Sequence, residues 1–439
     1  MSLDKTLSAT YTAILEEELV PAMGCTEPIA IAYAASILRH ALGAEPTALR
    51  VGLSGNIIKN VKSVIVPATG GMHGIEAAVA AGLVAGCPDR RLEVLRALEP
   101  TDSDRIRDLL ARLQMQVYEL ETRHPFELDM LGQVEISGVL HEVRVRIEER
   151  HTGVSSVTVD GRDLTERYLH GTDDGHSVAP APDRSLLNVK DIVSFAEEVD
   201  LSEGSPLRPL LLRQMEMNMA IAEEGLRGDW GASIGKLLYN NGNCNLPTRA
   251  RAYAAAGSDA RMNGCELPVC IISGSGNQGM TASVPVIVYA REWGVDEDTL
   301  LRALTVANLV TVHQKTGIGC LSAYCGAISA GCGCGCGIAY LNGGRFYEIA
   351  HTLVNAVAIL SGTICDGAKA SCAAKIAMAV EAGIMGYEMI RAGRQFMGGD
   401  GIVQKGIENT IRNVGRLARD GMSETDRQII RSMLGEGAP

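Results

Sequence analysis

Aromatic side chains are scarce in this chain of 439 residues, at 4% of the total, whereas glycine is abundant, with 49 residues. A core built without many rings depends on small side chains that let backbones approach closely, as they do where helices pack on helices. The length also exceeds the size at which a single hydrophobic core keeps growing, so we expect two domains.

Positive charge is scarce as well. The formal net charge is -12, the sequence pI is about 5.3, and no dense run of Lys and Arg occurs. A surface for nucleic acid or anionic lipid needs a basic patch, so we expect neither partner. The segment Met1–Thr10 lacks the basic and apolar regions of a secretory signal, which favours a cytoplasmic protein.

Long apolar runs are missing too. Residues 316–344 carry no charged side chain, and roughly 20 apolar residues would cross a bilayer. This stretch, however, consists mostly of Gly, Ala, Cys and Ser, which makes it too weakly apolar for lipid. It predicts a buried central helix, and we expect no membrane partner.

The residue pattern changes twice along the chain. Residues 6–42 predict two helices broken at Pro21 and Gly24. Short β-rich runs follow, with helices at 74–83 and 102–113, and the period of two at Val143, Val145 and Ile147 is typical of half-buried strands. The predicted strands include residues 48–53, 63–66 and 116–120.

After a polar stretch at 161–184, the pattern is helical to the end. We therefore predict an α+β fold in three parts. Residues 1–45 form N-terminal helices that pack on the helical domain, residues 46–180 form an α+β domain, and residues 185–439 form an all-α catalytic domain around the buried central helix.

Twelve cysteines in a cytosolic chain of this size are unexpected as a disulfide framework, so they are core residues, metal ligands or both. On a helix, Cys332 and Cys336 share one face and Cys334 points to the other, so CGCGC predicts close helix packing and no metal site. Four scattered cysteines are expected in the core: Cys87, Cys244, Cys265 and Cys270.

Several segments combine turn residues with functional groups: GCTEP (24–28), LSGNIIKN (53–60), PATGGMHG (67–74), SGSGNQGMTASVP (273–285), GCLSAYCG (319–326) and CDGAKASC (365–372). In this order they resemble the L-cysteine desulfidase family, which is similar in turn to the iron–sulfur L-serine dehydratases. The resemblance covers nearly the whole chain. It implies a [4Fe-4S] cluster that three cysteines hold and that leaves one iron open.

Carried onto this chain, the resemblance implies Cys25, Cys325 and Cys365 as the metal ligands. An open iron acts as a Lewis acid that can accept a carboxylate together with a leaving thiol or hydroxyl. Cys320 and Cys372 each lie within a turn or two of an implied ligand and stay open as replacements.

The elimination also needs a base for the Cα proton. PATGGMHG is similar to the TGxGHG segment of the serine dehydratases, which implies that His73 moves the proton, with Lys369 and His151 as further candidates; His313 is expected to be structural. The glycine-rich loops suit the binding of an amino-acid carboxylate. The expected substrate-binding residues are Ser54, Asn56, Lys59, Thr69, Ser275, Asn277 and Gln278.

The resemblance implies a lyase that takes a small L-amino acid and converts L-cysteine by β-elimination to pyruvate, ammonia and hydrogen sulfide. We expect the protein to form a homodimer. GCTEP stands where serine dehydratases carry an SHT-type segment, which favours cysteine over serine. L-serine dehydration, another small amino acid, a pyridoxal-phosphate lyase and a non-enzymatic iron–sulfur sensor are the alternatives. The cysteine placement argues against the pyridoxal-phosphate enzyme, and the charge balance argues against a DNA-binding sensor.

Overall fold

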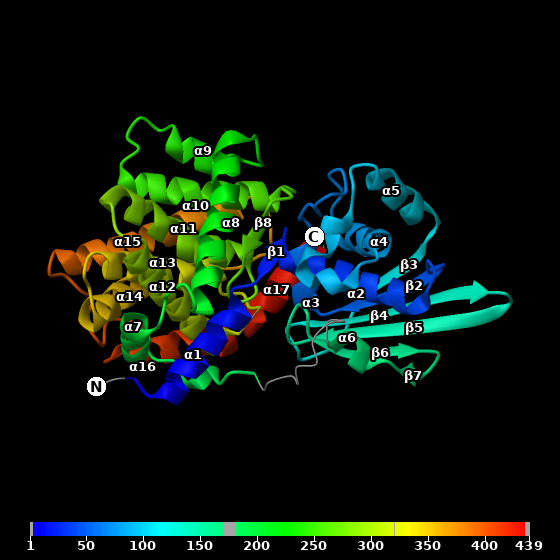
Figure 1. The fold of residues 1–439 in the computed structure, drawn as a ribbon, viewed down its shortest axis with the longest axis horizontal. Helices are drawn as coiled ribbons and strands as arrows, with labels where there is room; N and C mark the ends of the chain where they lie inside the picture. Colours follow the sequence, from blue (N-terminus) through cyan, green and yellow to red (C-terminus); the bar gives the residue numbers. More distant parts are fainter. Residues whose placement is uncertain (1–2, 170–180, 320, 435–439) are drawn as a thin grey trace.

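A computed structural model describes residues 3–169, 181–319 and 321–434 of the chain. It contains two regions that lie side by side (Figure 1): a mixed sheet with its covering helices, and a larger helical region. The sheet comes from the N-terminal half and the helical region from the C-terminal half, so the predicted α+β class is confirmed.

The main sheet has six strands in the order β3-β2-β4-β5-β6-β7. The pairing of β2 with β3 is parallel, and every other pairing is antiparallel. The long β4–β5 hairpin extends away from the helical region (Figure 1). The strands are β2 (Ala48–Leu53), β3 (Gln114–Glu119), β4 (Glu127–Ile136), β5 (Val139–Glu148), β6 (Val154–Val159) and β7 (Arg162–Asp163).

Helix α2 lies on the sheet, and α4 packs against α2. Both contacts depend on glycine. A Cβ at Gly132 of β4 would come within 2.6 Å of the Leu38 side chain, and a Cβ at Gly82 of α4 would come within 2.1 Å of the Ala32 carbonyl oxygen. The helices of this region are α2 (Thr26–Leu42), α3 (Gly55–Val61), α4 (Ile75–Ala85), η1 (Pro88–Ala97), α5 (Asp102–Arg112) and α6 (Thr165–Leu169).

The helical region is built around α13 (Gly326–Leu341), whose residues from Ala327 onward are all buried. Helices α12 and α15 pack against it most extensively, and α11 and α14 complete its surroundings. The other elements are α7 (Val189–Glu198), α8 (Leu207–Arg227), α9 (Ile234–Tyr239), α10 (Leu246–Met262), α11 (Gly276–Trp293), α12 (Glu297–Ile318), α14 (Phe346–Leu360), α15 (Cys372–Arg391), α16 (Ile407–Arg416) and α17 (Ser423–Leu434), with the short η2 (Arg184–Leu186) and η3 (Leu417–Gly421).

The glycines of the CGCGC segment let α13 touch two helices at once. A Cβ at Gly331 would lie 2.2 Å from the Ala379 carbonyl oxygen of α15, and a Cβ at Gly333 would lie 2.5 Å from the Ala307 carbonyl oxygen of α12. The cysteines between these glycines are 0–1% exposed. The predictions of a buried central helix and of close packing by small residues are confirmed. No helix in the described part of the chain is long and apolar enough to span a bilayer.

The N-terminal segment is divided between the two regions. Helix α1 (Lys5–Glu18) contacts α7, α8 and α12, and strand β1 (Pro21–Met23) pairs with β8 (Pro268–Cys270) of the helical region. Helix α2 instead packs in the sheet region, because its apolar residues are buried on nearly all sides by α4, η1 and the sheet. The break at Gly24 is therefore the place where the chain passes from one region to the other.

The predicted strand at residues 63–66 is wrong. Only Ile65 forms a bridge, with His73. The run ends at Pro67, which has no N–H to continue a ladder. Val64 is instead buried beside Cys25 and Met262, so this apolar segment packs as a loop.

Candidate functional site

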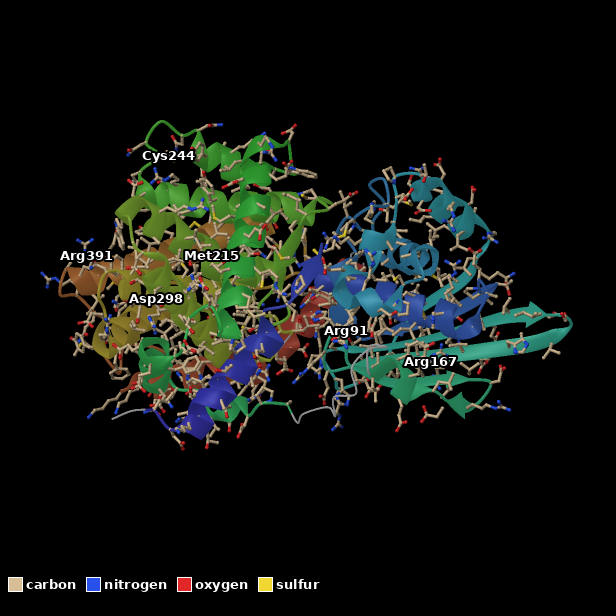
Figure 2. The ribbon with its side chains drawn as sticks, viewed as in Figure 1. Arg91, Arg167, Met215, Cys244, Asp298 and Arg391 are labelled. Carbon is tan, nitrogen blue, oxygen red and sulfur yellow. The ribbon has the colours of Figure 1, made fainter. Side chains whose placement is uncertain are left out.

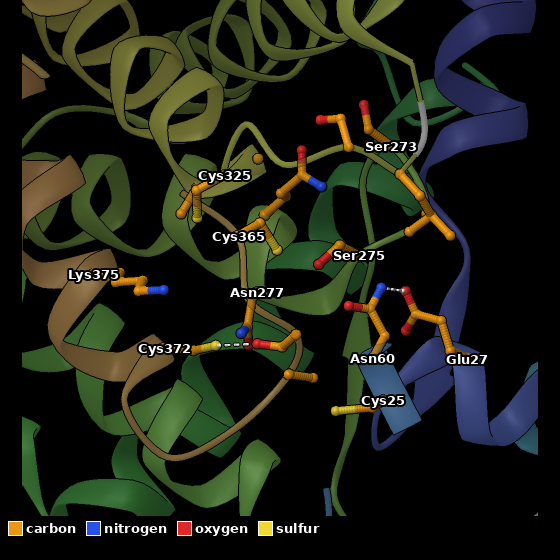
Figure 3. A pocket seen from close by; sticks show the side chains of 18 of the residues that line it. Cys25, Glu27, Asn60, Ser273, Ser275, Asn277, Cys325, Cys365, Cys372 and Lys375 are labelled. Atoms are coloured by element: carbon orange, nitrogen blue, oxygen red, sulfur yellow. Dashed lines mark hydrogen bonds between the residues drawn. The ribbon is translucent and has the colours of Figure 1, made fainter. Parts of the chain in front are cut away.

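A cavity of about 100 Å³ lies where the two regions meet. Its walls come from the starts of α2, α11 and α13, from the loop that leads into α15, and from loops of the sheet region. Figure 3 shows four cysteines projecting toward this space. They are Cys25, Cys325, Cys365 and Cys372.

Three of these cysteines stand at the N-terminal ends of helices. Cys25 is the N-cap residue of α2, Cys325 is the N-cap residue of α13, and Cys372 is the first residue of α15. The N-terminus of α11, capped by Ser275, faces the same cavity. Helix N-termini carry partial positive charge, so this arrangement favours thiolates and a bound carboxylate.

Cys325 and Cys365 are neighbours, and the interaction of their thiols raises the pKa of Cys325 and lowers the pKa of Cys365. The nearby Lys59 ammonium also lowers the pKa of Cys365. The pKa of Cys25 is not lowered in this way. Burial raises the pKa of its thiol to about 12, against a smaller opposite effect of Arg261.

The cysteines form two neighbouring pairs. Cys25 and Cys372 pack on the same small apolar cluster, with Val64 and Met262, while Cys325 and Cys365 form the second pair. Among the described residues, no three His, Cys, Asp or Glu side chains converge on a point where one metal ion could be held. A cluster differs from a single ion because its cysteine ligands bind separate irons. The donor set of soft sulfur atoms around one buried cavity fits an iron–sulfur group.

The opposite wall is polar and belongs to the sheet region. Asn60 donates to Glu27 Oε1 over 2.9 Å, and Thr26 donates to Glu27 Oε2 over 3.1 Å. His151 Nε2 lies 3.8 Å from Glu27 Oε1. Burial alone would raise the pKa of Glu27, but the attraction of His151 and Arg261 outweighs it and holds the pKa at about 2.

Several polar atoms on the cavity wall have no hydrogen-bond partner among the described residues. They are Asn60 Oδ1, His151 Nε2, Ser273 Oγ and Gln278 Oε1. Buried polar groups are nearly always paired, and an unpaired one calls for an explanation. Their presence on one cavity indicates a polar ligand.

Cationic side chains also reach the cavity. Arg261 donates to the Gly24 carbonyl oxygen over 3.0 Å and to Asn277 Oδ1 over 3.1 Å. Lys375 donates to the Ile364 carbonyl oxygen over 3.0 Å and pairs with Asp366, and Lys315 lines the wall as well. Arg261 can balance the negative charge of a thiolate or of a bound carboxylate.

The structure brings together six of the predicted site residues. The three implied ligands line the cavity, and so do Ser275, Asn277 and Gln278 of the SGSGNQG loop. Cys372, the open alternative, and His151, the further candidate for the base, line it too. Cys320 lies outside the described residues.

The other predicted residues lie elsewhere. Ser54 donates to the Pro125 carbonyl oxygen, Lys59 Nζ pairs with Asp426 at 2.5 Å, and Thr69 bonds within its own loop. Lys369 Nζ is held by Asp366, and Asn56 does not line the cavity.

His73 is exposed and lines a different, open cavity with Gly70 and Arg107. It does not line the cysteine cavity. Thr69, fully buried, holds this loop in place by hydrogen bonds to the Val66 and Met72 carbonyl oxygens. The geometry therefore does not support His73 as the base.

Sequence reasoning missed Glu27, Asn60, Arg261 and Lys375. Glu27 and Asn60 stand inside the segments GCTEP and LSGNIIKN, one or two residues from candidates that were named. Lys375 lies ten residues after Cys365, beyond the end of CDGAKASC. Arg261, in an Ala-rich helix, has no sequence signal of its own.

A second cavity, of about 380 Å³, adjoins the first and shares His151, Ser273, Gly274 and Lys315 with it. Its charged lining is internally paired, since Arg184 bonds to Glu17 and Glu18. At the other edge of the molecule, Cys244 lies far from both cavities on the outer side of the helical region (Figure 2). His313 is paired with Glu408 at 2.7 Å and ties α12 to α16, as a structural residue would.

Residues 89–431 match the profile of the serine dehydratase alpha chain. Relatives that align over almost their whole length are UPF0597 proteins. The one from Desulfitobacterium hafniense (strain Y51) is 51% identical over 97% of both chains. That from Lachnoclostridium phytofermentans is 46% identical over 96% of this chain and 98% of its own, and that from Treponema denticola is 43% identical over 99% and 100%.

Proposed function

Because the chain belongs to the serine dehydratase alpha chain family, we propose that it is an iron–sulfur-dependent β-eliminating lyase which converts L-cysteine into pyruvate, ammonia and hydrogen sulfide. The family supports an elimination as the kind of reaction. The observation that carries the finer proposal is the buried cavity on which four cysteines face a wall of unpaired polar atoms.

Cys25, Cys325 and Cys365 would hold the [4Fe-4S] cluster, with Cys372 as the alternative to Cys25. When bound, the cluster supplies an open iron as a Lewis acid for the substrate carboxylate and the leaving group. Holding it requires thiolates, and the helix N-termini favour them, as does Arg261 at Cys25. Lys59 and Lys375, which are paired with Asp426 and Asp366, also lower the pKa of Cys365.

The chain's own residues bind and orient the amino acid. Ser275 and Asn277, at the N-terminus of α11, and the Arg261 guanidinium favour the carboxylate. Gln278 Oε1 and Asn60 Oδ1 are acceptors that the substrate ammonium can satisfy.

L-serine is the second candidate substrate, because the matching profile is that of a serine dehydratase chain. Serine and cysteine differ by one atom at the leaving position. The GCTEP segment, in place of the SHT-type segment, favours the thiol.

Anaerobic reconstitution with iron and sulfide, followed by a panel of L-amino acids, tests the proposal. We expect pyruvate from L-cysteine with one sulfide released per pyruvate, and a lower rate with L-serine. The same protein treated without iron is the control and should be inactive. Absence of pyruvate from every amino acid by fully loaded protein would contradict the proposal, and faster turnover of L-serine would reassign the substrate.

A further inference from the structure

His151 is the imidazole that the fold places on the cysteine cavity. It lies in the loop between β5 and β6 and is 8% exposed, yet it lines both the 100 Å³ cavity and its 380 Å³ neighbour. Its Nε2 atom is buried without a hydrogen-bond partner among the described residues. A buried imidazole on the wall of a cavity is placed to act on a ligand bound there.

The surroundings of His151 fix the orientation of its ring. Phe126 packs edge-on at 4.7 Å between ring centroids. The Nδ1 and Cε1 edge lies over Gly274, where a Cβ would approach Cε1 to 2.9 Å and Nδ1 to 3.2 Å. Gly274 belongs to the SGSGNQG loop that lines the cysteine cavity, and its φ of +72° suits glycine.

Glu27 faces the other edge of the ring, with Oε1 3.8 Å from Nε2. Asn60 and Thr26 hold this carboxylate in place, and Thr26 also donates to the Gly274 carbonyl oxygen over 2.8 Å. A carboxylate on one side of an imidazole favours the tautomer with its hydrogen on the near nitrogen, which leaves the far nitrogen as a base.

The rival candidates lack this placement. His73 is exposed on a separate cavity, and the Lys369 ammonium is held by Asp366 and by the Gly367 carbonyl oxygen. Within the described residues, His151 is the histidine that lines the cysteine cavity.

We propose that His151 Nδ1 is the base that removes the substrate Cα proton and that Glu27 is its positioning residue; this assignment rests on the proposed function. The electron pair of the Cα–H bond forms the Cα=Cβ bond as the Cβ–S bond breaks. Sulfur leaves with that bonding pair as HS⁻, and the proton stays on His151 until water accepts it. The aminoacrylate product tautomerises to an imine, and one water hydrolyses the imine to pyruvate and ammonia.

The charged groups around His151 come from several elements. Glu27 faces it from α2, Arg261 from α10 and Lys315 from α12, while Glu17, Glu18, Arg150 and Arg184 surround the adjoining cavity. Because several of these groups can affect a pH profile, the contribution of His151 is taken from the difference between the profiles of the wild type and the variant.

The experiment compares His151→Gln with His141→Gln in the reconstituted full chain. His141 lies on β5, outside both cavities, and bonds to Asp160. We expect His151→Gln to lower kcat by about 10² to 10⁴ and to remove the acidic limb of the pH profile, as for a positioned general base. His141→Gln should match the wild type. Circular dichroism shows whether each variant folds, and cluster absorbance shows whether it binds the cluster. If His151→Gln fails either check, His151→Asn is the second variant.

Proton removal is measured separately from loss of the leaving group. In D2O, the wild type should exchange the α-hydrogen of L-alanine, which has no leaving group, and His151→Gln should not. Glu27→Gln should reduce this exchange by about tenfold or more, and Glu27→Asp should restore part of it.

The results distinguish a wrong assignment of His151 from a wrong proposed function. If wild type makes pyruvate and His151→Gln keeps its turnover and pH profile, the assignment of His151 is overturned alone. If His73→Gln abolishes exchange while His151→Gln retains it, His73 is the base. If the loaded wild type forms no pyruvate, the proposed function is overturned and this assignment with it.

Discussion

The four cavity cysteines differ, residue by residue, in what surrounds them. The Cys325 and Cys365 thiols interact with each other, whereas Cys25 contacts Met262 and Cys372 donates to the Gly367 carbonyl oxygen over 3.7 Å. We expect serine variants of Cys25, Cys325 and Cys365 to lose stably bound iron on reconstitution, because serine is a poor replacement for a thiolate ligand. Iron content and cluster absorbance after desalting measure this loss.

Cys372→Ser and the peripheral Cys244→Ser serve as the comparison, and both should retain iron. The opposite result, with iron lost from Cys372→Ser and kept by Cys25→Ser, would make Cys372 the third ligand.

Asp259, in α10, destabilises the folded protein when it ionises at neutral pH. It is fully buried, its Oδ2 accepts from the Gly235 amide over 2.8 Å, and its Oδ1 has no partner among the described residues. Burial raises its pKa to about 6. The fold thus favours the protonated form, and this stabilisation is complete below about pH 4 and is lost as the pH rises through about 6.

In the wild type, the free energy of unfolding should fall by about 1–3 kcal/mol between pH 4.5 and 7.5 because of Asp259, and Asp259→Asn should remove this fall. Urea unfolding at several pH values measures the free energy of unfolding of both proteins. Asp104→Asn, at an exposed helix position, is the control and should leave the pH dependence unchanged. A variant with the same pH dependence as wild type would show that Asp259 is ionised without cost.

At the scale of elements, α13 is held by backbone contacts that only glycine allows. Alanine is a better helix former than glycine by about 1 kcal/mol, which favours Gly331→Ala. The new Cβ would, however, stand 2.2 Å from the Ala379 carbonyl oxygen, and overpacking costs about 1–3 kcal/mol. Since the obstacle is backbone, we expect a net loss of at least about 1 kcal/mol in the free energy of unfolding.

Urea unfolding checks this loss against Gly204→Ala, where a Cβ would meet nothing within 4 Å. That control should be neutral or slightly stabilising. Equal stabilities for the two variants would mean that α13 and α15 can separate at no cost, which would contradict the tight packing described above.

At the scale of the whole molecule, the C-terminal helix α17 returns to the sheet region and packs on α3 (Figure 1). Lys59 of α3, with its side chain 1% exposed, pairs there with Asp426, and Lys62 donates to the Met433 carbonyl oxygen. The Lys59 carbonyl oxygen also lies against Gly367, in the loop between Cys365 and Cys372. Helix α3 thus connects α17 to the cysteine loop.

Asp426→Asn should destabilise the protein by about 3 kcal/mol, because it leaves a buried ammonium without its counter-charge. The double variant Lys59→Met with Asp426→Leu should recover most of that loss, since replacing both partners by apolar groups is often nearly neutral. Urea unfolding and hydrogen exchange of α17 measure both. If Lys59→Met instead abolished turnover without changing stability, Lys59 would be a substrate residue after all.

The sequence by itself determined the parts of this protein that depend on local pattern. The strand at residues 48–53 was predicted from its β-rich composition, and the helices at 74–83 and 102–113 from helix-favouring segments; the structure has β2 at Ala48–Leu53, α4 at Ile75–Ala85 and α5 at Asp102–Arg112. Geometry within one helix also predicted that CGCGC serves close helix packing, and α13 packs closely on α12 and α15. Three cysteines and the SGSGNQG loop were also chosen from their motifs, and they line one cavity, although their roles stay predictions.

Only the tertiary structure decided which of the remaining polar residues reach that cavity. His73 and His151 both follow turns in loops of the sheet region, and nothing local tells on which side of the region each loop ends. Likewise, Lys59 pairs with Asp426 of α17, which lies 367 residues further along the chain. Such contacts depend on how two separately patterned regions pack together, and the spacing of residues within either region does not contain that information.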